Sequence, residues 1–386
     1  MDPLGPALRV ADLFVPLAPG SRPTPVADPV AVVAATIPRV SVLAISEALE
    51  QGAITARWAR AASGLWRWTF GRSVVRRVPW PPGVRVIAVG GATLGGSGKT
   101  PLAIACALEL ASGGVRATVV GHGYRGRLDR ARFVSPLDPV CLVGDEALLA
   151  ARALDGCPRA RVVVAPTRLA AMSLAARDSD VLVLDGVSQT QPIRATLALL
   201  AVDDDEPWGH ARALPPCGDL RAPISTLVAA CDAVVPLTDR TSCPRIEHAQ
   251  TRQVWPAWVE SRGAWLRPAQ PAHGNGPLLS WEELAVLRVG VVAALARPER
   301  VVRRLVRRGV RPCAIVRGPD HGPFGREFAR ACRTAAGGRI DVWVATEKCA
   351  LHAADAVLGA PLAVMEHGLA LHPELRASVR QVAPLP

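Results

Sequence analysis

The stretch that decides the fold is residues 90–101, Gly-Gly-Ala-Thr-Leu-Gly-Gly-Ser-Gly-Lys-Thr-Pro. It follows a short apolar run at residues 84–89 and opens a segment at residues 100–111 that is compatible with a helix. Strand, glycine-rich loop and helix in this order are typical of a phosphate-binding loop, because glycines let backbone N–H groups surround phosphate oxygens at a helix N-terminus. The stretch therefore predicts an α/β domain of the P-loop NTPase type.

The loop also supplies side chains for phosphate and metal binding. Lys99 can reach the β- and γ-phosphates of a nucleotide, and the Thr100 hydroxyl can bind Mg²⁺. The strict eight-residue pattern has glycine at the position of Thr93, and a glycine-rich turn that binds nothing is the alternative. The expected nucleotide-binding residues are Thr93, Gly95, Gly96, Ser97, Gly98, Lys99 and Thr100.

A kinase further needs carboxylates near the phosphates. Asp185 ends the apolar run Leu-Val-Leu-Asp at residues 182–185, where it can bind Mg²⁺ together with Thr100. Asp145 and Glu146 open a helical segment in the sequence Val-Gly-Asp-Glu. Each also has an ordinary structural explanation, since Asp before a helix is usually an N-cap and Asp-Gly is usually a turn.

Outward from the loop, short apolar runs alternate with helical segments. The runs lie at residues 117–120, 161–165, 180–184, 197–202 and 233–237, and again at 289–292, 314–316, 341–344 and 362–364. This alternation predicts parallel sheets covered by helices on both faces. We expect a P-loop NTPase-like parallel-sheet domain and a second, smaller α/β domain.

Four segments follow from these patterns. They are an irregular Pro- and Ala-rich extension at 1–43, a P-loop kinase domain at 44–238, a linker at 239–283 and a C-terminal α/β domain at 284–386. A helix is expected within residues 44–77, where Arg57, Arg60 and Arg67 mix with Trp58, Trp66 and Trp68. Such mixing suits a membrane–water interface, and a surface helix with its aromatics packed on the domain is the alternative.

The amino-acid composition excludes or disfavours several classes of protein. The chain of 386 residues has no apolar run near the ~20 residues of a spanning helix, so a polytopic membrane protein is excluded. The net charge of +12 indicates an anionic partner, although only Lys99 and Lys348 are lysines. The nine cysteines form no C-x-x-C pair, which disfavours a disulfide framework or a zinc site. The basic positions of residues 300–308 are typical of a solvated helix face.

Seven motifs in one order resemble the tetraacyldisaccharide 4'-kinase family, the lipid A 4'-kinases of Gram-negative bacteria. The motifs are residues 90–101, 123–124 (Gly-Tyr), 143–146 (Val-Gly-Asp-Glu), 216–223 (Pro-Cys-Gly-Asp-Leu-Arg-Ala-Pro), 297–300 (Arg-Pro-Glu-Arg), 319–321 (Pro-Asp-His) and 346–348 (Thr-Glu-Lys). The resemblance covers roughly residues 50–370. It includes the phosphate loop, where that family too has Thr in place of the first glycine and Pro after Gly-Lys-Thr.

The resemblance implies transfer of the γ-phosphate of Mg·ATP to the 4'-hydroxyl of a tetraacylated glucosamine disaccharide 1-phosphate. It further implies two α/β domains joined by a β-ribbon linker, with the active site between them. By position, Asp145 is the catalytic base, His321 is its partner from the second domain, and Lys99 acts on the phosphates. We expect a monomer at the cytoplasmic face of the inner membrane, peripheral or monotopic, with a lipid A precursor and no nucleic acid as partner.

Several positions depart from the family pattern. Leu184 replaces the first of two adjacent aspartates, so that Asp185 remains alone. Ser188 and Gln189 replace a Gln and a His, and Cys349 replaces the Asp after Thr-Glu-Lys. A catalytically weakened or altered member that binds nucleotide or lipid is therefore an alternative. A basic nucleic-acid-binding NTPase is a further alternative, prompted by the arginine content.

Overall fold

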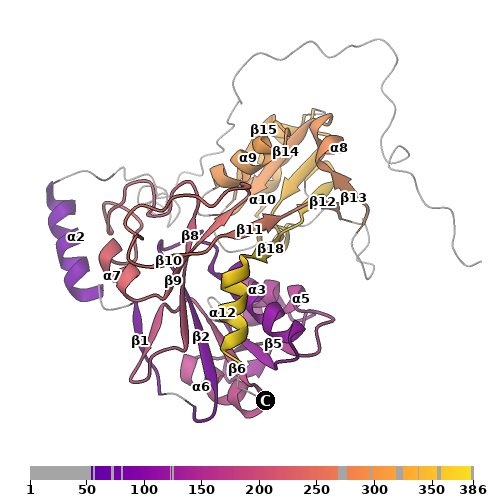
Figure 1. The fold of residues 1–386 in the computed structure, drawn as a ribbon. Helices are drawn as coiled ribbons and strands as arrows, with labels where there is room; N and C mark the ends of the chain where they lie inside the picture. Colours follow the sequence, from indigo (N-terminus) through magenta and orange to yellow (C-terminus); the bar gives the residue numbers. More distant parts are fainter. Residues whose placement is uncertain are drawn as a thin grey trace, which may run out of the picture.

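The computed structural model describes residues 54, 57–70, 74–79, 81–121, 123, 126–267, 276–295, 298–318, 325–337, 339–353 and 358–383. The expected extension at 1–43 and the expected catalytic His321 lie outside these residues. The described strands form two main sheets, one in each of two α/β domains (Figure 1).

The larger sheet is mostly parallel. Its strand order is β18-β11-β9-β8-β2-β6-β3-β5-β4, with β10 also paired to β9. The bounds are β2 Arg85–Gly91, β3 Ala117–Val120, β4 Arg132–Phe133, β5 Ala160–Val164, β6 Val181–Asp185, β8 Leu197–Asp203, β9 Ala233–Thr238, β10 Gln253–Val254, β11 Ala257–Glu260 and β18 Gly368–Leu371. Only β4 and β18, near the edges, run antiparallel to their neighbours.

The smaller sheet is mixed, with the order β13-β12-β17-β16-β14-β15. Its strands are β12 Gly263–Leu266, β13 Leu278–Ser280, β14 Val289–Ala293, β15 Ala314–Arg317, β16 Val342–Ala345 and β17 Leu362–Met365. A separate parallel pair is formed by β1 Val75–Arg77 and β7 Gln189–Gln191. The α/β class and the two-sheet architecture expected from the sequence are confirmed.

Helices cover the two sheets. They are α2 Arg57–Phe70, α3 Lys99–Ser112, α4 Val140–Val143, α5 Asp145–Ala153, α6 Arg168–Ala175, α7 Ile224–Ala229, α8 Trp281–Ala285, α9 Pro298–Arg307, α10 Arg326–Ala336, α11 Glu347–Ala350 and α12 Pro373–Gln381. In the central strand β2, Ile87 and Val89 pack in the core layer that contains α3, while Val86 and Ala88 pack in the layer that contains α6. Burial on both faces explains why such strands read as continuous apolar runs.

A two-stranded antiparallel ribbon connects the domains. Its first arm runs from β11 into β12, and its second arm runs from β17 into β18. Ala257 pairs with Leu371 in the larger sheet, and Ala264 pairs with Met365 in the smaller one. The first arm lies in the segment expected as a linker at 239–283, whereas the return arm comes from far along the chain.

The last described residues lie on the larger domain. Helix α12 packs beside α3, and Leu375, Val379 and Val382 are buried in the same apolar cluster as that helix (Figure 1). Arg380 Nε donates to Glu109 Oε1 of α3 at 2.6 Å. The range 284–386 was expected as one C-terminal domain. Its last two described elements belong to the larger domain instead, because β18 pairs with β11 of the larger sheet and α12 packs beside α3.

Within residues 44–77, where a helix was expected, the described residues contain helix α2 and, after it, strand β1. The strand follows because Val74 and Val75 are β-branched and favour extended backbone. The helix lies at the outer edge of the larger domain (Figure 1). Trp58 and Trp68 are 65% and 81% exposed, so these two aromatic side chains do not pack on the domain. Ser63 Oγ anchors the helix by donating to Leu214 O at 3.0 Å.

The basic face of α9 does not face solvent as expected. It faces the acidic end of β8 in the larger domain, and the helix is held there by ion pairs across the two domains. The pairs are Arg300 with Asp203, Arg303 with Glu206, and Arg307 with Asp205 and Asp239. These three arginines are therefore paired within the chain.

Within the described part of the chain, no helix has both the length and the apolar character needed to cross a bilayer.

Candidate active site

The phosphate loop joins β2 to α3 at the carboxyl end of the larger sheet. Gly96 and Gly98 have φ values of 66° and 80°, a left-handed backbone that glycine adopts without steric cost. Gly98 is also the N-cap of α3, and a Cβ there would lie 2.3 Å from Leu237 Cδ2. Both backbone conformation and close packing therefore require glycine at position 98.

A second segment holds the loop in place. Leu94 N donates to Asp219 O at 2.8 Å, and the Arg221 guanidinium donates to Thr93 O at 2.7 Å and to Leu94 O at 2.9 Å. Thr93 itself is buried, and its hydroxyl donates to Gly95 O at 2.7 Å. Arg221 was not among the expected site residues, although it lies in one of the family motifs. The structure places Thr93 as a residue that shapes the loop.

Lys99 lies folded over the loop. A Cβ on Gly91 would come within 2.8 Å of Lys99 Cγ and Cδ, so glycine at this position gives the lysine stem its path. Desolvation, followed by the charge of Arg221, lowers the pKa of Lys99 to about 8. The negative charges of Glu146 and Asp185 act in the opposite direction and raise the pKa of Lys99. The ammonium group is therefore poorly compensated, as suits a site that is completed by phosphate oxygens.

Thr100 and Asp185 meet next to Lys99. Thr100 Oγ1 donates to Asp185 Oδ2 at 2.7 Å, and both residues are buried. Asp185 Oδ1 is buried too, and it has no hydrogen-bond partner among the residues that the structure describes. Burial, followed by the charge of Glu146, raises the pKa of Asp185. The Thr100 hydroxyl and the Asp185 carboxylate, which has one buried oxygen without a partner among the described residues, are hard oxygen donors that fit Mg²⁺.

Arg168 fixes the strand end that carries Asp185. Its guanidinium donates to Asp185 O at 3.0 Å and to Val120 O at 3.3 Å. Burial lowers the pKa of Arg168 to about 10, and the charge of Asp185 partly offsets this. Arg168 follows Thr167, the N-cap of α6. Nothing in the sequence distinguishes it from the many other arginines, so it was missed.

Asp145 lies where the two domains meet. Its carboxylate is buried at the start of α5, where Oδ1 accepts from Glu146 N at 2.9 Å. From α11 of the second domain, Lys348 Nζ lies 3.6 Å from Asp145 Oδ2. His352 Nε2, one turn further on, lies 3.7 Å from the same oxygen. The structure thus brings Asp145 together with residues of the Thr-Glu-Lys segment.

The positions that depart from the family pattern have structural partners here. Leu184 is fully buried in the apolar cluster with Met172, on the side of the sheet away from α3. Gln189 Oε1 accepts from Thr190 N and Ala195 N, and therefore shapes a turn. The Cys349 thiol accepts from Ala294 N at 3.2 Å.

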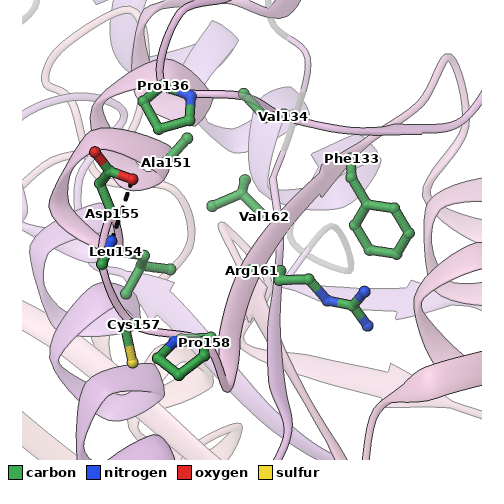
Figure 2. Close-up of a pocket in the computed structure, with 12 residues that line it drawn as sticks. Phe133, Val134, Pro136, Ala151, Leu154, Asp155, Cys157, Pro158, Arg161 and Val162 are labelled. Carbon is green, nitrogen blue, oxygen red and sulfur yellow. Dashed lines mark hydrogen bonds between the residues drawn. The ribbon is translucent and has the colours of Figure 1, made fainter.

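A shallow pocket lies elsewhere on the larger domain. It has a volume of about 440 Å³ and is lined by the segment before β5, by β5 itself and by Phe133 and Val134 (Figure 2). Arg161 stacks over the Phe133 ring at 4.4 Å and pairs with Asp178. The pocket shares no residue with the site around Lys99 and Asp185.

A parallel sheet, a glycine loop before a helix, and a Lys, Thr and Asp set at the carboxyl strand ends define a P-loop kinase fold. Comparison with known proteins agrees. A family model described as tetraacyldisaccharide-1-P 4'-kinase matches residues 54–383. The chain belongs to this family, whose members are ATP-dependent phosphotransferases of lipid A biosynthesis.

Individual relatives support this assignment. A tetraacyldisaccharide 4'-kinase of Anaeromyxobacter sp. (strain K) is 32% identical over 320 residues, covering 79% of this chain and 81% of the relative. One from Methylobacterium radiotolerans is 32% identical over 294 residues, covering 73% and 81%. A crystal structure of LpxK from Aquifex aeolicus, described as an "apo" form in complex with ATP, superposes with a TM-score of 0.59 at 17% identity. It covers 84% of this chain and 99% of that protein, and it shows the shared fold.

Proposed function

We propose that this chain is an active kinase in which one carboxylate, Asp185, holds the metal side of the site. Its donor would be ATP with Mg²⁺, and its acceptor the 4'-hydroxyl of a tetraacylated glucosamine disaccharide 1-phosphate. The observation that carries the proposal is the buried Thr100–Asp185 pair beside Lys99, with Asp185 Oδ1 left open to a further ligand.

The phosphate side of the reaction rests on the loop. The backbone of residues 95–98 and the N-terminus of α3 would bind the phosphates, and the Lys99 ammonium would neutralise charge on the β- and γ-phosphates. Ser97 Oγ, buried and without a hydrogen-bond partner among the described residues, is placed to donate to a phosphate oxygen. Thr100 and Asp185 would hold Mg²⁺, which when bound supplies positive charge to the phosphate oxygens.

The acceptor side of the reaction rests on Asp145. The 4'-hydroxyl oxygen forms a bond to the γ-phosphorus while the bond from that phosphorus to ADP breaks. The hydroxyl proton passes to Asp145, since a carboxylate within reach can accept it as the new bond forms. Asp145 is buried and stands at the domain junction, which suits a base that acts only when both substrates are bound. His321 would assist Asp145 from the second domain.

The membrane side of the function rests on α2. Trp58, Leu65 and Trp68 are exposed along one side of this helix, and large exposed apolar side chains there are suited to a membrane–water interface. We infer that α2 attaches the chain peripherally to the cytoplasmic face of the inner membrane, where the lipid substrate lies. The chain would act as a monomer, since residues of one chain supply both sides of the site.

The test is phosphate transfer by purified protein. Radiolabelled γ-phosphate from ATP should appear on the disaccharide lipid with the wild-type protein. Asp145→Asn should bind ATP with unchanged affinity and transfer at a rate lower by about 10²-fold or more. Wild-type protein that binds ATP but transfers nothing would favour the weakened family member instead, and an unimpaired Asp145→Asn variant would refute the role of Asp145.

A further inference from the structure

The side chain of His352 is largely covered and lies against the proposed base of the other domain. It is 9% exposed, and its Nε2 atom lies 3.7 Å from Asp145 Oδ2. Nε2 has no hydrogen-bond partner among the residues that the structure describes. A buried imidazole nitrogen without a partner costs free energy, so this placement requires an explanation.

The local fold directs His352 towards Asp145. Thr346 caps α11 by accepting from Cys349 N, and Leu351 at the C-cap keeps a helical conformation. His352 N donates to Cys349 O at 3.1 Å, which continues the turn. Lys348 and His352 are therefore i and i+4 neighbours on one face of a helical turn. Both point at the same carboxylate oxygen, at 3.6 Å and 3.7 Å.

His352 Nε2 and Asp145 Oδ2 lie slightly too far apart for a hydrogen bond. An N–H···O bond is about 2.9 Å long, so closing the gap needs a movement of less than about 1 Å. Hydrogen bonds at catalytic groups are often long without substrate and shorten in the reactive complex. A small approach of α11 to α5 would therefore give Nε2 its missing partner and fix the orientation of the Asp145 carboxylate.

We propose that His352 is a positioning residue for phosphate transfer. In the closed complex its Nε2–H donates to Asp145 Oδ2, while Lys348 adds positive charge at the same oxygen. The orientation of Asp145 towards the 4'-hydroxyl then depends on the second domain. His352 neither touches the phosphates nor receives the sugar proton, which goes to Asp145. The inference rests on the proposed role of Asp145 as the base.

The test compares three variants by steady-state kinetics on ATP and the lipid disaccharide. His352→Ala should lower kcat by about 10- to 100-fold, the size typical of a lost partner behind a reacting group, with KM for ATP within about twofold. His352→Gln keeps a side-chain N–H donor and should recover most of kcat. His210→Ala is the matched control, because the His210 side chain is 67% exposed and lies against Glu206, not against Asp145.

The outcomes separate this inference from the proposed function. If the Asp145→Asn variant is impaired but the His352→Ala variant has a normal kcat, the role of His352 is overturned and Asp145 remains the base. A lowered kcat that Gln does not recover, together with a lowered thermal midpoint, would mean a structural role and would overturn it too. An unimpaired Asp145→Asn variant would remove the base, and the role of His352 would fall with it.

Discussion

The hydroxyl of Thr100 donates a 2.7 Å hydrogen bond to Asp185 Oδ2, although 85 positions separate the two residues. The contact joins the first turn of α3 to the end of β6, because β2 and β6 are parallel neighbours in the sheet. It leaves the other carboxylate oxygen of Asp185 buried and open. Sheet topology therefore brings together the two residues that we propose as metal ligands.

Asp185→Asn should abolish most activity without unfolding the protein. The amide preserves shape but removes the negative charge that would hold Mg²⁺, so kcat should fall by about 10²-fold and half-saturation should need about tenfold more Mg²⁺. Magnesium titration of the transfer rate measures this. Asp155→Asn, on an exposed turn near the pocket, is the control. An unchanged magnesium requirement would show that another residue is the ligand.

Nucleotide binding should weaken as the pH rises past 8. The pKa of Lys99 is lowered to about 8, so the free protein carries the ammonium below that pH and the neutral amine above it. Phosphate binding favours the ammonium, and the dissociation constant for ATP should therefore increase above pH 8 by up to about tenfold per pH unit. Calorimetry from pH 7 to 10 measures this. Lys99→Arg should remove the dependence, and a flat wild-type profile would contradict it.

Leu184→Asp should not restore a second metal ligand. Leu184 is fully buried in an apolar cluster, so a carboxylate there would lack partners and should lower the free energy of unfolding by roughly 3 kcal/mol. Urea denaturation measures the loss. Leu184→Val, which removes only volume, should cost about 1 kcal/mol. A stable Leu184→Asp variant with a lower magnesium requirement would argue against this view.

Arg221→Ala should loosen the phosphate loop. The guanidinium donates to Thr93 O and Leu94 O, so its removal should raise KM for ATP by about tenfold while the lipid KM stays constant. Arg221→Lys should be nearly as impaired, since a single ammonium cannot replace the planar fork. A KM for ATP within twofold of wild type in both variants would show that the clamp is dispensable.

Trp58→Ser combined with Trp68→Ser should reduce membrane binding. Each exposed indole would contribute about 1.5–3 kcal/mol when buried in the interface, so partitioning onto anionic vesicles should drop by more than tenfold. The transfer rate on detergent-dispersed substrate should not change. Leu137→Ser removes an equally exposed apolar side chain, 82% exposed on a loop, and should bind vesicles normally. Equal loss in both proteins would exclude α2 as the attachment site.

Much of the fold could be predicted from local pattern. β3 (Ala117–Val120) and α5 (Asp145–Ala153) coincide with the expected segments, because a short apolar run and a regular apolar spacing are local signals. The phosphate loop with Lys99 could be predicted as well, since glycines before Lys-Thr between a strand and a helix are typical of phosphate binding. The return of β18 and α12 to the larger domain could not be predicted, because strand pairing over a long sequence distance leaves little local signal in the sequence.

The candidate site was predictable only in part. Lys99, Thr100 and Asp145 belong to motifs, and Asp185 ends an apolar run; the structure places each near the phosphate loop or the domain junction. Arg168 contacts backbone carbonyls, and His352 lies against Asp145 of the other domain; no spacing in the chain encodes either contact. The basic face of α9 was misinterpreted for the same reason, since its acidic partners at the end of β8 lie some hundred residues earlier.

In the function that we propose, the single carboxylate Asp185 suffices for an active lipid kinase. The most direct measurement is the turnover rate of purified wild-type protein on tetraacyldisaccharide 1-phosphate with ATP and Mg²⁺, with the position of the new phosphate read by phosphorus NMR. We predict turnover with the phosphate on the 4'-oxygen, lost in Lys99→Ala. Wild-type protein that binds ATP but leaves the lipid unphosphorylated, or that phosphorylates another oxygen, would contradict the claim.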